Sequence, residues 1–153
     1  VGEVTRITNP ITIDHTLLRQ YLLPGLLRLL SSNRHHDLPQ SVYELGTVVR
    51  DHNNSSRLAF LVAERTGGFA GSRGRIQAFL RDLGANEYEV QPLPDNEGPW
   101  LAGRAAKIIV NGNHIGCFGE IDPHVAEHFE LKVPMNGAEF CLNEIAKAIP
   151  DPV

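Results

Sequence analysis

The sequence predicts an α+β domain whose antiparallel sheet is flanked by helices. Two observations carry this prediction: strand-like runs follow one another across short turns, and helical patterns fall between the resulting hairpins. The chain has 153 residues, about the size of one domain, and its 42% hydrophobic residues suffice for a packed core. We therefore expect a single domain over residues 1–153.

A leucine-rich helix is expected to begin near Pro24, after a short strand at 4–7. At about 100° per residue, its leucines spread over roughly 160°, which is wider than the apolar stripe of an ordinary surface helix. Such a helix packs on more than one neighbour. We therefore predict an assembly surface, with burial inside the domain as the alternative, formed by Leu26, Leu27, Leu29 and Leu30.

The first hairpin is expected from strands at 41–49 and 57–63, joined by a polar turn at 51–56. A glycine-rich loop at 67–74 follows. Ser72 is positioned to cap the next helix. Gly84 is expected to end that helix, and a short strand should follow at 88–93.

The second hairpin has the stronger local signal, because Asn111-Gly112 separates strand-like runs at 107–110 and 113–121. Asp122-Pro123 is typical of a capped helix start. A final strand is expected over 138–145.

Composition excludes several classes of protein. The chain carries 14 basic and 18 acidic residues, so it lacks the basic surplus of a nonspecific nucleic-acid binder. No apolar run is long enough to span a membrane, and no secretory signal opens the chain. Cys117 and Cys141 lie in strand-like runs and are expected to be reduced, buried thiols. The expected location is the cytoplasm. The start at Val1 favours a piece of a longer polypeptide.

Motifs for catalysis and metal binding are weak. The pairs His35/His36 and His124/His128 have no well-spaced third ligand, so we predict no metal site. The run Gly71–Arg75 could cradle a phosphate, but it lacks the Gly-Lys-Ser/Thr ending of a nucleotide-binding loop. No activated serine motif is present. The basic cluster is expected to be a solvated face, formed by Arg65, Arg73, Arg75 and Arg81.

Three acids stand among apolar neighbours in predicted strands: Glu44, Glu120 and Glu139. A carboxylate in a strand interior is costly unless it is paired. We therefore predict a buried charge network in which Arg19 and Arg104 are the cations. Ligand binding by these groups is the alternative.

The order of motifs resembles the phenylalanyl-tRNA synthetase beta chain family, in its compact archaeal or eukaryotic form. The resemblance extends over about residues 7–145. Its motifs are Asn9-Pro10-Ile11, Leu18-Arg19, Leu22–Leu27, Asn33, Tyr43–Gly46, Gly74–Gly84, Gly103–Ala106, Gly116–Pro123 and Ala138–Phe140. Two positions depart from the family pattern: Arg73 replaces a lysine, and Asp122 replaces a histidine.

The resemblance implies a class II aminoacyl-tRNA synthetase-like domain that is catalytic-like but inactive. In that family the alpha chain attaches phenylalanine to tRNA(Phe) with ATP, and two alpha and two beta chains form a heterotetramer. ATP and magnesium would serve the parent complex, and none is expected in this part of the beta chain. Glu44 lies on the strand that carries a phosphate-binding arginine in active class II sites.

Three hypotheses about function stay open. The first is a non-catalytic structural and assembly module of phenylalanine–tRNA ligase. The second is a small-molecule ligase with a class II-like fold that uses Arg73, Arg75 and the strand acids. The third is a stand-alone binding module derived from the same fold.

Overall fold

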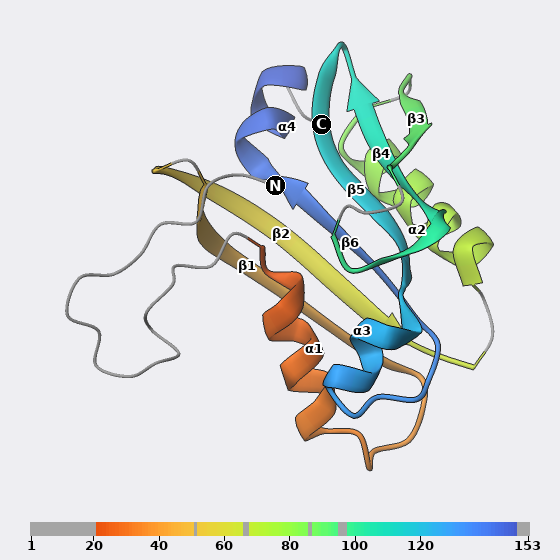
Figure 1. Cartoon of the computed structure of the whole chain (residues 1–153). Helices are drawn as coiled ribbons and strands as arrows, with labels where there is room; N and C mark the ends of the chain where they lie inside the picture. Colours follow the sequence, from red (N-terminus) through yellow and green to blue (C-terminus); the bar gives the residue numbers. More distant parts are fainter. Residues whose placement is uncertain (1–20, 51, 66–67, 86, 95–97, 150–153) are drawn as a thin grey trace.

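The computed structural model describes residues 21–149 except 51, 66–67, 86 and 95–97. Its centre is an antiparallel sheet of six strands in the order β1-β2-β6-β5-β4-β3 (Figure 1). This arrangement confirms the predicted fold class. The strands are β1 (Gln40–Arg50), β2 (Asn53–Ala63), β3 (Glu89–Pro92), β4 (Trp100–Val110), β5 (Asn113–Ile121) and β6 (Met135–Cys141). The helices are α1 (Leu23–Ser32), α2 (Gly68–Asp82), α3 (Pro123–His128) and α4 (Leu142–Ala148).

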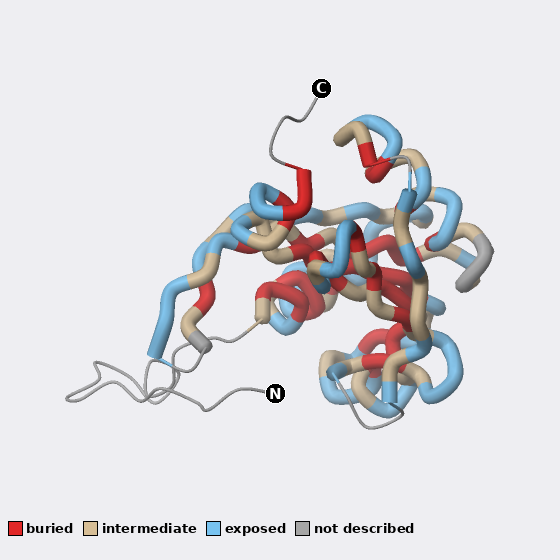
Figure 2. Tube along the Cα trace, turned by 90° about the horizontal axis from the view of Figure 1, so that it is seen from above, coloured by how far each residue is buried: buried red, intermediate tan, exposed pale blue. Residues whose placement is uncertain are grey.

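The helices cover opposite faces of the sheet. Successive residues of a strand point to opposite faces, and β6 shows where each face leads. Glu139 accepts hydrogen bonds from the start of α1, whereas the ring of Phe140 lies 4.7 Å from that of Phe79 on α2. The core is accordingly divided into one cluster under α1 and α3 and another under α2 and α4. Figure 2 shows these buried segments between exposed outer ones.

The leucine-rich helix forms where it was predicted, but most of its leucines lie in the core. Leu26, Leu27 and Leu30 are at most 2% exposed, whereas Leu29 is 44% exposed. The wide apolar arc is covered inside the domain, because α1 packs on the sheet and shares its cluster with Ala126 of α3. The expectation of an assembly surface is therefore wrong for the three buried leucines. Of the four, Leu29 alone remains available to a partner.

The first hairpin has a tighter turn than the sequence predicts. The β1–β2 ladder continues to the pair Arg50–Asn53, so only residues 51–52 lie between the strands. His52 adopts a positive φ of 65° in this turn. Polar residues at 53–56 are thus strand residues, because pairing with β1 satisfies their backbone. The strand expected at 4–7 lies outside the described residues.

The second helix begins earlier than expected. Residues from Gly68 onward are helical, so Ser72 lies within α2 and not at its N-cap, and it is fully buried. The glycine-rich run is therefore not a loop that could wrap a phosphate. Gly84, with a φ of 88°, follows the helix and confirms the predicted end.

The second hairpin turn forms as predicted, whereas the last strand has other bounds than the predicted 138–145. Asn111 and Gly112 have φ of 49° and 79°, as the predicted two-residue turn requires. Asp122 caps α3 by accepting a hydrogen bond of 2.9 Å from the His124 amide. The last strand starts earlier and ends at Cys141, since residues 142–148 form α4 and not a continuation of β6. Among the helices of the described part, none is long and apolar enough to cross a membrane.

Candidate functional site

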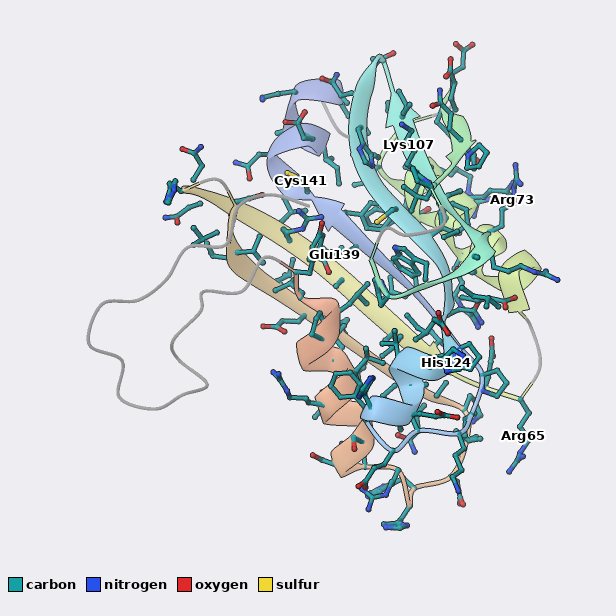
Figure 3. All side chains as sticks on the ribbon, in the orientation of Figure 1. Arg65, Arg73, Lys107, His124, Glu139 and Cys141 are labelled. Atoms are coloured by element: carbon teal, nitrogen blue, oxygen red, sulfur yellow. The ribbon has the colours of Figure 1, made fainter. Side chains whose placement is uncertain are left out.

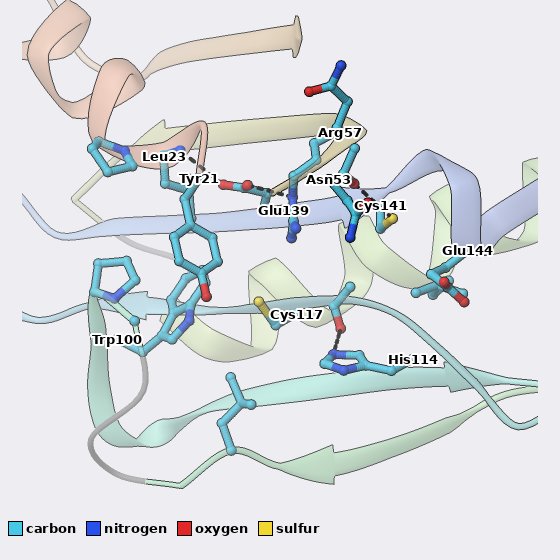
Figure 4. Close-up of a pocket in the computed structure, with 18 residues that line it drawn as sticks. Tyr21, Leu23, Asn53, Arg57, Trp100, His114, Cys117, Glu139, Cys141 and Glu144 are labelled. Atoms are coloured by element: carbon cyan, nitrogen blue, oxygen red, sulfur yellow. Dashed lines mark hydrogen bonds and ion pairs between the residues drawn. The ribbon is translucent and has the colours of Figure 1, made fainter. Parts of the chain in front are cut away.

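A cavity of about 810 Å³ lies on the face of the sheet that carries α1 (Figure 4). Its floor comes from strands β2, β6 and β5, through Arg57, Glu139 and Cys117. The segment just before α1 contributes Tyr21, and the start of β4 contributes Trp100. This volume is in the range of small-molecule sites in proteins, so the cavity is the candidate functional site.

A buried ion pair lies on the cavity floor. Glu139 is fully buried, and its Oε2 lies 2.8 Å from Nε of Arg57 on the neighbouring strand. The same carboxylate accepts hydrogen bonds of 2.9 and 3.0 Å from the amides of Leu22 and Leu23. Because Leu22 provides no side-chain cap for α1, Glu139 satisfies the free N–H groups of the helix start from 117 positions away in sequence.

Burial has the largest influence on the pKa of Glu139. Loss of solvent raises the pKa of Glu139 above its ordinary value, while Arg57 and the two amides act in the opposite direction. Arg57 is also almost completely buried, and its guanidinium lies 5.5 Å from the centre of the Tyr21 ring. The guanidinium is thus surrounded by groups of the protein itself.

The rest of the cavity lining is mixed, with apolar side chains such as Leu93, Trp100 and Ile115 beside polar ones, and has little charge. Ser55 Oγ lies 3.3 Å from Cys141 Sγ, and Cys117 lies near the middle of the cavity in Figure 4. Both cysteines are half-buried, whereas the sequence predicts buried thiols. Glu144 lines the far end of the cavity and pairs with Lys147 at 3.2 Å.

Four of the five predicted network residues lie in the described part of the chain, and they do not share one environment. Glu139 alone among the three acids is buried; Glu44 and Glu120 are only partly buried. Glu44 lies near the start of α1. If Gly25 carried a side chain, its Cβ atom would lie 3.7 Å from Oε1 of Glu44. Glu120 occupies the α2 face of β5, because Phe118 two residues earlier packs there. The two acids therefore belong to different environments.

Only one of the two predicted cations lies in the described part of the chain. Arg104 is exposed on β4, and Arg19 lies outside the described residues. The cation that pairs with Glu139 is Arg57, which the sequence reasoning overlooked. A signal was present: Arg57 stands in the same alternating position as the core residues Ala59 and Leu61, so its side chain must point inward.

The other candidate groups lie away from the cavity. The four histidines of the predicted pairs are exposed, and the described residues contain no metal-binding group of three ligands. Arg73 points outward from α2, as Figure 3 shows, and Arg75 pairs with Glu64 at 2.9 Å. Because α2 covers the opposite face of the sheet, neither arginine can serve the cavity.

The fold is that of a class II aminoacyl-tRNA synthetase. The structure of a pyrrolysyl tRNA synthetase from Desulfitobacterium hafniense matches 93% of this chain and 51% of its own, with a TM-score of 0.75 and 17% identity. This likeness concerns the fold alone. It places the chain in a structural class without assigning a substrate.

The chain belongs to the phenylalanyl-tRNA synthetase beta chain family, and it is the catalytic-like module of such a chain. The family model of the phenylalanyl tRNA synthetase beta chain CLM domain matches residues 2–142. The phenylalanine–tRNA ligase beta subunit of Archaeoglobus fulgidus is 40% identical over 90% of this chain and 24% of its own length. That of Methanothrix thermoacetophila is 38% identical over 93% and 26%. The chain thus spans about a quarter of the curated relatives that it matches.

Proposed function

We propose that this chain is a non-catalytic structural and assembly module of a phenylalanine–tRNA ligase. In this proposal it supports an alpha chain that attaches phenylalanine to tRNA(Phe) with ATP, in a cytoplasmic heterotetramer of two alpha and two beta chains. ATP and magnesium serve the alpha chain, and this module holds neither. Contact with tRNA(Phe) comes through the whole complex.

One observation carries the proposal: the cavity's cation is used to hold the fold. Arg57 is the only arginine or lysine among the described residues that line the cavity, and it is paired with buried Glu139. Glu139 in turn holds the start of α1. A triphosphate needs cations that are free to bind its oxygens, and withdrawing Arg57 would leave Glu139 buried and unpaired.

The remaining charges also oppose nucleotide binding. Glu139 and Glu144 bring two carboxylates to the described lining against one guanidinium. Like charges repel more strongly in a partly buried site than in water. The small-molecule ligase hypothesis relied on Arg73 and Arg75, which lie on the opposite face of the sheet from the cavity.

Two measurements on one preparation test the proposal. Calorimetric titration with ATP and magnesium is expected to show no binding at micromolar concentrations. A pull-down with a candidate alpha chain is expected to recover a stable complex. ATP binding without alpha-chain capture would support the ligase hypothesis. The absence of both ATP binding and alpha-chain capture would support a stand-alone binding module.

A matched pair of variants then asks whether α1 takes part in assembly. Leu29→Glu changes the exposed leucine, while Arg28→Glu changes an exposed neighbour on the same helix without removing apolar surface. If Leu29 contacts the alpha chain, only the first variant should weaken capture. Equal capture by both variants would place the interface elsewhere on the module.

A further inference from the structure

The edge strand β1 has little of the usual protection against pairing with another strand: within residues 41–49 its one charged residue is Glu44. Within the described part of the chain its outer side has no neighbour in the sheet. It is 11 residues long and keeps an uninterrupted register with β2. Residues 41–49 contain no lysine, arginine or proline. Natural edge strands are usually short, bulged, or marked by such residues, because free N–H and C=O groups recruit other strands.

The same strand exposes large apolar side chains. Tyr43 is 74% and Leu45 is 63% exposed, and they are two of the three large hydrophobic residues exposed on the described chain. Their cross-strand partners on β2 are Phe60 and Leu58, which are half-buried. These four residues, called the edge strip below, form one apolar surface on the α2 face of the sheet, because directly paired residues share a face.

We propose that β1 pairs with β1 of a second copy of this chain, in antiparallel register about a twofold axis at Leu45. This contact goes beyond the proposed function and does not depend on it. The two sheets would join into one continuous sheet, and the two edge strips would meet on one face. An isologous contact of this kind closes after two copies, so it gives a dimer and not a fibre.

The sequence of β1 is complementary to itself in this register. Leu45 faces the partner's Leu45, and Tyr43 faces the partner's Thr47. Val42, which packs beneath α1, faces the partner's Val48, so two β-branched residues meet on the other face. Pairs of aromatic and β-branched residues stabilise antiparallel strands.

Charge does not oppose pairing with a second copy. Glu44 is the only charged residue of 41–49, and in this register it faces the partner's Gly46. No two carboxylates are therefore placed opposite one another. A register centred on Tyr43 would lose the Leu45 pair, and one centred between Leu45 and Gly46 would pair side chains of different faces.

The oligomeric state of the 153-residue chain tests the proposal. Sedimentation over a range of concentrations should show a reversible monomer–dimer equilibrium. Leu45→Lys should weaken the dimer at least about tenfold, since it removes the central apolar contact and places two ammonium groups on the axis. Leu29→Lys, the same change at an exposed leucine on α1, should leave the dimer unchanged. Circular dichroism confirms that both variants are folded.

Cysteine cross-linking tests the register. Residues directly opposite in an antiparallel pair have Cβ atoms about 4.5–5.5 Å apart, so Leu45→Cys should form a disulfide-linked dimer on mild oxidation. Tyr43→Cys is the matched control, because two such cysteines would lie four positions apart along the paired strands. The parent chain supplies the background from Cys117 and Cys141.

Four results would each overturn the proposal. The first is a chain that stays monomeric at every concentration. The second is a dimer that Leu45→Lys leaves intact. The third is cross-linking of the Tyr43→Cys variant as readily as the Leu45→Cys variant. The fourth is protection of 41–49 from hydrogen exchange only after an alpha chain is added, which would identify that chain as the occupant.

Discussion

The ion pair between Arg57 and Glu139 should be the most sensitive point of the domain. Arg57→Met leaves a fully buried carboxylate without its cation, and removing one partner of such a pair typically costs about 3–5 kcal/mol. Glu139→Leu should cost at least as much, because it also leaves the amides of Leu22 and Leu23 without an acceptor. Glu139→Gln should be milder, since its amide oxygen can still accept those hydrogen bonds.

Urea unfolding followed by circular dichroism measures these costs. The double variant Arg57→Met/Glu139→Leu should be less destabilised than the sum of the single variants, because no buried charge remains. Leu29→Ala on exposed α1 surface serves as the control. A loss below about 1 kcal/mol for Arg57→Met, the value typical of an exposed pair, would refute the reasoning.

The same pair gives the stability of the domain a specific pH dependence. Burial raises the pKa of Glu139 above its ordinary value of 4.5, so the folded state keeps this proton to a higher pH than the unfolded state. The resulting stabilisation is complete below the ordinary value and is lost as pH rises through the raised pKa. The free energy of unfolding of the wild type, relative to Glu139→Gln, should therefore increase on acidification. The opposite slope would mean that Arg57 outweighs burial.

Two further predictions concern the turn of the second hairpin and the leucine helix. Gly112→Val should lower stability by about 1–2 kcal/mol in a thermal melt, because a β-branched residue resists the φ of 79°, while Gly112→Asn should be better tolerated; equal melting temperatures would contradict this assignment. Leu27→Glu should abolish cooperative unfolding, because it places a carboxylate in the core, whereas Leu29→Glu should remain folded; a folded Leu27→Glu protein would contradict the packing of α1.

Features with a local cause could be predicted from the sequence. Asn111-Gly112 adopts its turn because both residues tolerate positive φ, and Asp122 caps α3 through its own side chain. Gly84 ends α2 for a similar reason. In each case the residues that decide the structure are neighbours in sequence, so no knowledge of the rest of the fold is needed.

Features decided by distant contacts were missed. The polar residues at 53–56 resemble a turn until their pairing with β1 is known. Ser72 resembles a helix cap, but packing on the sheet extends α2 beyond it in the N-terminal direction. The apolar arc of α1 was measured correctly, yet periodicity cannot distinguish a partner chain from α3 as the element that covers it.

The candidate site shows the same division between local and distant causes. A buried acid was predicted at Glu139 because its neighbours are apolar, and this is confirmed. Its partner could not be chosen from composition, since Arg57 reaches it only through the β2–β6 register, in which Arg57 faces Cys141 and Ala59 faces Glu139. Knowledge of that register, and not of residue type, was the missing information.

In the proposed non-catalytic module, the pairing of Arg57 with Glu139 gives the cavity floor a structural role. The floor strands of such a cavity must carry inward-facing side chains, and a charge there is costly unless it is satisfied. In this chain the carboxylate on β6 is satisfied by a cation from β2 and by the start of α1, so three elements distant in sequence are held together at one point. A ligand that recruited Arg57 would leave Glu139 buried without its cation. Stability of the module and binding of a triphosphate therefore make opposite demands on Arg57.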